Sequence, residues 1–122
     1  MSTTLLPEWR ALADRVVAEY RAALGDDLVA IALFGSVARG QARADSDLDL
    51  YVVTRRAILG DSRLHGMWGR IDASSEYQAL VRAGYHPTPS RVSHTVDDLA
   101  RHPWILLDIS HHGVSPGEVV DL

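Results

Sequence analysis

The chain has 122 residues and a mass of 13.4 kDa, and we expect it to form a single domain over residues 1–122. Hydrophobic residues make up 47% of it, too many for a disordered chain, and the lack of Cys excludes disulfide frameworks, Cys-ligated zinc and thiol nucleophiles. The formal net charge of −4 argues against a protein held on nucleic acid by bulk attraction, and no apolar run is long enough for a transmembrane helix.

The charged residues exclude further classes of protein. All 12 basic residues are Arg, so neither a lysine nucleophile nor a P-loop lysine is possible. The first amphipathic stretch carries Glu8, Arg10 and Asp14, which does not fit a signal peptide. We therefore expect a cytoplasmic protein.

The first predicted element is an amphipathic helix over residues 7–24. Pro7 suits the first helical position and Gly25 suits the left-handed stop. The apolar residues recur at spacings of three and four and form one stripe: Trp9, Leu12, Ala13, Val16, Val17, Tyr20, Ala23 and Leu24. This pattern predicts a helix with one face in the core.

Two strands with a short helical turn between them are predicted next. The apolar run LVAIALF over residues 28–34 predicts a strand buried on both faces. Residues 36–40 predict a turn of helix, capped by Ser36 and stopped by Gly40. After a polar loop, residues 47–53 alternate in the period of a strand.

The second half of the chain gives weaker signals. Residues 61–83 are predicted to be helical, although Gly66 and Gly69 weaken the pattern, and a new helix could begin at Ser74. Residues 90–94 are a weak strand candidate, and a capping box at residues 95–98 opens a short helix toward His102. Residues 104–109 fit helix or strand, and residues 118–122 could add a strand. The alternation predicts an α/β (α+β) fold, a small mixed sheet with helices packed on it.

The most informative pair of residues is Asp47 and Asp49. They are two apart on the predicted strand, so they point to the same face with Cα atoms about 6.6 Å apart. Two carboxylates on one face of an otherwise apolar strand are costly unless a cation lies between them. A pair of Mg²⁺ ions fits this geometry, although a solvated face of an edge strand would have the same pattern.

The residues just upstream predict an anion site. Gly35 allows close approach of a phosphate, and the helix that begins at Ser36 has free backbone N–H groups and a hydroxyl to bind it. Arg39 could reach the same anion or equally face solvent. Metals beside a phosphate cradle point to phosphoryl or nucleotidyl transfer.

These residues resemble a known family signature. Gly35-Ser36 with Gly40, followed by Ser46-Asp47-Leu48-Asp49-Leu50, is similar to the signature of the DNA polymerase beta-like nucleotidyltransferase superfamily. The chain length and the short Gly-Ser helix look most like its minimal nucleotidyltransferase (MNT) branch. The resemblance is strong over residues 31–53 and weak beyond residue 54.

The resemblance implies an activity and a set of site residues. It implies a Mg²⁺-dependent enzyme that transfers a nucleoside monophosphate, with AMP from ATP as the expected case, to an unknown acceptor. Asp47 and Asp49 match the metal-binding pair, while Gly35 and Ser36 match the residues that hold the triphosphate. Ser46 and Arg39 are further candidates for nucleotide binding.

The chain departs from the family pattern in one respect. The family supplies a third carboxylate from a later strand, and the candidate strand over residues 90–94 contains no acid. Either that strand is missing or Asp108 takes the role, and Asp108 could equally be a surface or capping residue. The alternative function is therefore a degenerate module that binds a nucleotide or a partner without turnover.

The resemblance also suggests partners. Many solitary members act as the antitoxin of a helical HEPN protein, so we expect such a partner or a homodimer, and neither direct nucleic-acid binding nor a membrane contact. Three Trp residues in a short chain predict some exposed apolar surface. The adjacent His111 and His112 do not share a face, and we interpret them as a polar terminus.

Overall fold

The computed structural model describes residues 6–34, 42–104 and 119–120. Within this part, four strands form a mixed sheet in the order β3-β2-β1-β4. The strands are β1 (Leu28–Phe34), β2 (Asp47–Thr54), β3 (Thr88–Thr95) and β4 (Val119–Val120). β1 pairs antiparallel with β2 and β4, whereas β3 runs parallel to β2.

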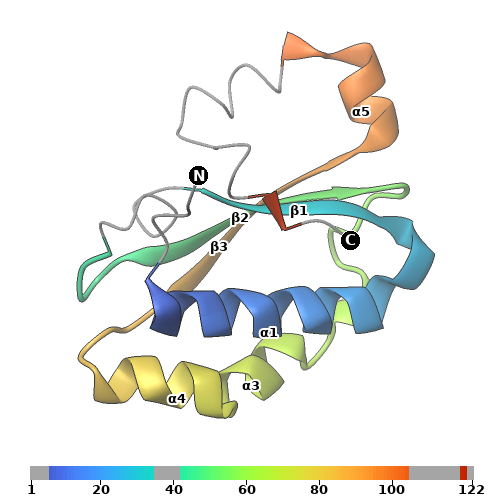
Figure 1. Cartoon of the computed structure of the whole chain (residues 1–122). Helices are drawn as coiled ribbons and strands as arrows, with labels where there is room; N and C mark the ends of the chain where they lie inside the picture. The colour runs from blue at the N-terminus through green and yellow to red at the C-terminus, as the bar shows by residue number, and fades with distance from the viewer. Residues whose placement is uncertain (1–5, 35–41, 105–118, 121–122) are drawn as a thin grey trace.

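The helices lie on both faces of this sheet (Figure 1). The long helix α1 (Pro7–Leu24) packs on one face, and α3 (Met67–Asp72) and α4 (Ser75–Arg82) lie against α1 on that side. The short helix α5 (Val96–Arg101) lies on the other face. Two 3₁₀ turns, η1 (Gly25–Asp27) and η2 (Ser62–Leu64), connect these elements. The predicted mixed sheet with packed helices is confirmed.

The first half of the chain forms the elements that its sequence predicts. α1 and β1 have the predicted bounds, and Gly25 caps α1 with a φ of 54°, a conformation that glycine adopts without a Cβ penalty. β2 extends one residue beyond the prediction, to Thr54. The predicted helical turn at residues 36–40 lies outside the described residues.

The predicted helical character of residues 61–83 is confirmed, and so is the restart at Ser74, whose hydroxyl accepts from the Tyr77 amide to begin α4. The part before Ser74 is further divided into η2 and α3, because Gly66 has a left-handed φ of 74° just before α3. β3 begins at Thr88, two residues before the predicted strand. The capping box of Thr95 and Asp98 forms as predicted, while most of the segment 104–109 lies outside the described residues.

The main core lies between the sheet and α1. Alternate residues of β1 and β2 pack there against the apolar stripe of α1 and against buried residues of α3 and α4, which include Met67, Ile71 and Leu80. A smaller apolar cluster on the opposite face joins Ala32, Tyr51 and Val53 with the partly buried Leu99 of α5. Among the described residues, the sheet is therefore covered by a large apolar cluster on one face and by a small one on the other.

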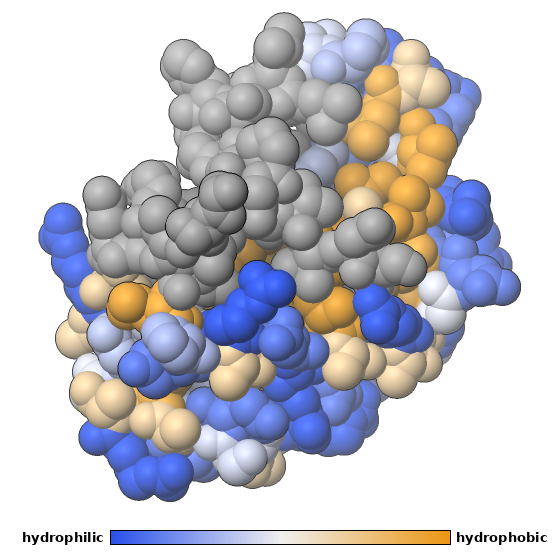
Figure 2. Space-filling view, viewed as in Figure 1, coloured by the Kyte–Doolittle hydropathy of each residue, from blue (hydrophilic) through white to orange (hydrophobic). Residues whose placement is uncertain are grey.

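Apolar side chains reach the surface near α5, as Figure 2 shows. Val96 at the start of α5 is 44% exposed, and Trp104 is 60% exposed. The prediction of some exposed apolar surface is confirmed, and Trp104 is not a core residue. None of the helices in the described part of the chain combines the length and the apolar character that a membrane span needs.

Candidate active site

β2 carries the two predicted metal ligands on one face. Leu48 and Leu50 point into the main core and are each 2% exposed, whereas Asp47 is exposed and Asp49 half-buried. Because side chains alternate along a strand, Asp47 and Asp49 share the face opposite to α1. The prediction that both carboxylates point the same way is confirmed.

The end of β1 lies beside these carboxylates. Phe34, the last residue of β1, pairs with Asp49 in the antiparallel register. The chain therefore leaves β1 next to the acidic pair, and Gly35, Ser36 and Arg39 follow directly in sequence. These three predicted nucleotide-binding residues lie outside the described residues.

A tight turn positions the first residue of β2. The Ser46 hydroxyl accepts from the Arg43 amide at 2.7 Å, and the Ser46 amide donates to the Arg43 carbonyl at 3.1 Å. The Ala44 carbonyl accepts from the His86 amide at 2.9 Å, which ties this loop to the segment before β3. Ser46 is buried, so its side chain orders the backbone that leads into Asp47.

Hydroxyl side chains occupy the neighbouring strand. The parallel register places Thr88 opposite Asp47 and Ser90 opposite Asp49, and both β3 residues are exposed. β3 contains no acid, as the sequence predicts. Among the described residues no group of three His, Asp or Glu side chains could hold a metal ion. Asp108, the candidate for a third carboxylate, lies outside them.

Beyond the carboxylates, the same face carries an aromatic pair, the buried Tyr51 and the half-buried His94, that our sequence analysis missed. The rings of Tyr51 and His94 meet edge to face with centroids 5.7 Å apart. The Tyr51 hydroxyl and His94 Nδ1 have no hydrogen-bond partner among the described residues. Burial, and then the nearby Asp98 carboxylate, raises the pKa of Tyr51. The alternation of β2 could have predicted that Tyr51 shares a face with Asp49. The position of His94 beside Tyr51 could not be predicted, because it depends on the pairing of β3 with β2.

The described residues thus supply two oxygen ligands of the kind that Mg²⁺ prefers. Asp47 and Asp49 are consecutive outward residues of one strand, at the end where β1 and β2 meet. In the described part of the chain no basic side chain forms an ion pair with Asp47. The donor set fits a divalent cation.

A comparison of the sequence with protein families identifies the domain. The model described as "Polymerase beta, Nucleotidyltransferase" matches residues 21–80, about half of the chain. The match runs from the end of α1 to α4 and includes both strands that meet at Asp49. The chain belongs to the polymerase beta-like nucleotidyltransferase superfamily. A search of curated proteins gave no match to this sequence.

Membership in this superfamily supports a nucleotidyltransferase-type function at a coarse level. It agrees with the mixed sheet, with helices on both faces and with the position of the acidic pair. Residues 31–53, which carry the sequence signature, lie within the matched segment of this superfamily member.

Proposed function

We propose that this superfamily member is a Mg²⁺-dependent nucleotidyltransferase that transfers AMP from ATP to an acceptor hydroxyl. The observation that carries the proposal is the placement of Asp47 and Asp49 on one face of β2, beside the end of β1, inside a segment that matches the family. ATP as the donor also makes the cytoplasm the expected compartment.

In the proposed reaction the acceptor oxygen attacks the α-phosphorus of ATP. The new bond joins that oxygen to phosphorus, the bond to the bridging oxygen of the β-phosphate breaks, and pyrophosphate leaves with its electron pair. The acceptor proton passes to a carboxylate or to water. Bound Mg²⁺ would supply charge neutralisation for the phosphates and a lower pKa for the attacking hydroxyl.

The chain's own residues would have separate tasks in this reaction. Asp47 and Asp49 would hold the metal, while Ser46 keeps the turn before β2 in place through its bond from Arg43. Gly35, Ser36 and Arg39 are proposed to bind the triphosphate, and Asp108 is proposed as the third carboxylate. The core residues Leu48 and Leu50 fix the strand that presents the acids.

A binding experiment tests the metal ligands. Isothermal titration with Mg·ATP is expected to show binding by the wild type and at least a tenfold loss in the double variant Asp47→Asn/Asp49→Asn. Asp45→Asn is the matched control, because Asp45 is an exposed acid two residues before β2. Equal binding by the wild type and the double variant would contradict the proposal.

A labelling experiment tests the reaction. Label from the α-phosphate of ATP should reach the acceptor, whereas label from the γ-phosphate should not. The transfer rate should fall by more than about 100-fold in Asp49→Asn, since the metal site supplies several kcal/mol of transition-state stabilisation. Asp108→Asn should abolish transfer only if Asp108 is the third ligand.

The neighbours of the acidic pair favour a second candidate function. Thr88 and Ser90 lie beside Asp47 and Asp49 on β3, where hydroxyls give a metal less charge than a carboxylate would. A member with two carboxylates could bind Mg·ATP or a protein without turnover. Binding of Mg·ATP with no transfer of the α-label to any acceptor would select this function.

We also propose a partner, on the basis of the resemblance to the MNT branch. A helical HEPN protein would be the acceptor of AMP, and this chain its antitoxin. The exposed apolar residues Val96 and Trp104 offer a surface for such a partner or for a second copy of the chain. Co-expression with the product of the adjacent reading frame should give a co-eluting complex. A monomer beside a neighbour that is not helical would contradict this part of the proposal.

A further inference from the structure

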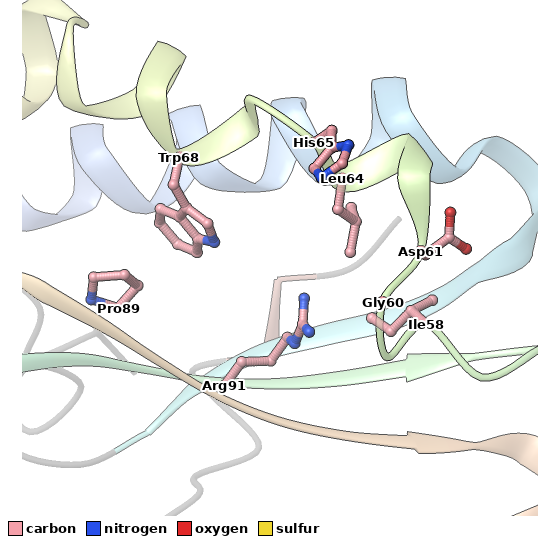
Figure 3. A pocket seen from close by; sticks show the side chains of 8 residues that line it. All are labelled: Ile58, Gly60, Asp61, Leu64, His65, Trp68, Pro89 and Arg91. Atoms are coloured by element: carbon pink, nitrogen blue, oxygen red, sulfur yellow. The ribbon is translucent and has the colours of Figure 1, made fainter.

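A cavity lies on the face of the sheet that α1 covers (Figure 3). Its volume is about 410 Å³, within the range of small-molecule sites. It lies between β3 and the η2–α3 segment, and its lining consists of Ile58, Gly60, Asp61, Leu64, His65, Trp68, Pro89 and Arg91. Figure 3 shows the Arg91 side chain reaching from β3 toward Leu64, with Trp68 and Pro89 to one side.

This cavity is separate from the acidic pair. Ser90 is in register with Asp49, and the next residue, Arg91, is in register with the core residue Leu50. Arg91 also donates to the Tyr20 hydroxyl of α1 at 3.4 Å, which places its side chain on the α1 face. The cavity and the carboxylates therefore lie on opposite faces of the same sheet.

Arg91 brings a positive charge that no described carboxylate balances. None of the ion pairs among the described residues includes Arg91. Its partner Tyr20 is a neutral phenol at neutral pH, because burial raises the pKa of Tyr20 despite the hydrogen bond from Arg91. A half-buried guanidinium without an anionic partner favours the binding of an anion.

The acid in the lining does not cancel this charge. Asp61 accepts from Arg63 at 2.7 Å and 3.1 Å, so its charge is already matched. Arg63 also contacts Asp27 at 2.8 Å, and Asp27 has a second partner in Arg56 at 3.6 Å, so two guanidinium groups balance these two carboxylates. Apart from the imidazole of His65, the unmatched charge at the described wall of the cavity is thus the positive charge of Arg91.

The rest of the lining suits a flat apolar group. Trp68 is half-buried, and the Tyr20 ring meets its indole edge to face at 6.4 Å between centroids, which helps to fix the orientation of the indole. Pro89, Ile58 and Leu64 add apolar surface around the same space. One cation beside planar and aliphatic walls fits a ring with one anionic substituent.

We propose that this cavity binds a small aromatic carboxylate, with the carboxylate on Arg91 and the ring against Trp68 and Pro89. A guanidinium matches a carboxylate with two parallel hydrogen bonds, and one unmatched positive charge suits a monoanion better than a dianionic phosphate. The site does not depend on the proposed transfer of AMP, because it uses the opposite face of the sheet.

Titration with chosen probes tests this site. Benzoate and indole-3-carboxylate should bind the wild type and shift the indole N–H signal of Trp68 in a nitrogen–proton NMR spectrum. Benzamide should bind at least about tenfold more weakly, since it lacks the charge that pairs with Arg91. Equal binding of benzamide and benzoate, or tighter binding of phenyl phosphate, would overturn the proposal.

Variants separate this site from the acidic pair. Arg91→Gln should weaken benzoate binding at least about tenfold, whereas Arg82→Gln, at an exposed arginine of α4, should bind like the wild type. Asp47→Asn/Asp49→Asn should bind benzoate unchanged, whatever its effect on Mg·ATP. Full binding by Arg91→Gln would overturn the proposal. If that variant fails to fold, the contrast between benzoate and benzamide in the wild-type spectrum decides it.

Discussion

Asp27 ties together two segments that are distant in the sequence. It lies in η1, is 8% exposed, and accepts from the Arg56 amide at 3.0 Å and from the Arg63 guanidinium at 2.8 Å. Arg63 in turn binds Asp61, so two carboxylates share one guanidinium. This network fastens the chain after β2 to the turn before β1. The hydrogen bond from Arg63, and after it that from the Arg56 amide, lower the pKa of Asp27 against the opposing effect of burial.

This network predicts a pH dependence of stability. Hydrogen bonds from Arg63 lower the pKa of Asp61 from 3.8 to about 2. A carboxyl whose pKa is lower in the folded state stabilises the fold above its unfolded pKa and loses that contribution as it is protonated. The midpoint of thermal unfolding, followed by circular dichroism, should therefore fall as the pH decreases from about 4 to about 2.

Asp61→Asn should weaken this acid dependence, because the side chain can no longer lose a charge. Asp72→Asn is the control, since Asp72 is exposed and has no ion pair among the described residues. An Asp61→Asn variant whose midpoint follows pH as steeply as the wild type would show that Asp61 does not carry the effect.

At the scale of elements, the helical connection from β2 to β3 is held by its caps. α3 has six residues and α4 has eight, which is too short for either to be stable alone. Ser74 lies between them, donates its hydroxyl to the Ile71 carbonyl, and accepts from the Tyr77 amide at 3.2 Å. One buried serine therefore ends α3 and begins α4.

Ser74→Ala should lower the free energy of unfolding by about 1 kcal/mol, the usual cost of a lost N-cap. Urea unfolding measures this change. Ser75→Ala is the matched control, since Ser75 is exposed one residue later and its hydroxyl makes a long 3.4 Å contact with Glu76 as its one side-chain hydrogen bond among the described residues. Equal losses in the two variants would rule out a capping role for Ser74.

At the scale of the whole molecule, the two faces of the sheet are expected to have different roles, one in stability and one in binding. In the described part of the chain, the main core joins α1, α3, α4 and the inner residues of β1 and β2 into one cluster, whereas the other face has a small cluster under α5. Stability should therefore come chiefly from the α1 face, while the opposite face carries the acidic pair.

Leu48 lies between the two acids in the sequence, but its side chain packs in the main core. Leu48→Ala should therefore leave a cavity in that core and destabilise the whole domain by about 2–5 kcal/mol. Leu59→Ala makes the same chemical change at a side chain that is 92% exposed, and it should stay within about 0.5 kcal/mol of the wild type. Urea unfolding followed by both circular dichroism and Trp fluorescence measures each loss. Similar losses in both variants would contradict this assignment of the core.

The sequence by itself determined the elements whose signals are local. The apolar stripe of α1, the apolar run of β1 and the alternation of β2 predict these elements and the shared face of Asp47 and Asp49, because helix and strand periods act over neighbouring residues. The signature within residues 31–53 is also a local pattern, so it predicted the family from the sequence alone, and the family comparison agrees.

Tertiary structure decided the contacts between distant segments. The parallel pairing of β3 with β2 places Ser90 beside Asp49 and His94 beside Val53, from where its ring meets that of Tyr51, and one cavity is lined by both Trp68 of α3 and Arg91 of β3. No short pattern encodes such contacts, because they depend on how the crossover from β2 to β3 packs on the sheet. The acidic pair could thus be predicted from the sequence, whereas its neighbours and the cavity at Arg91 required the fold.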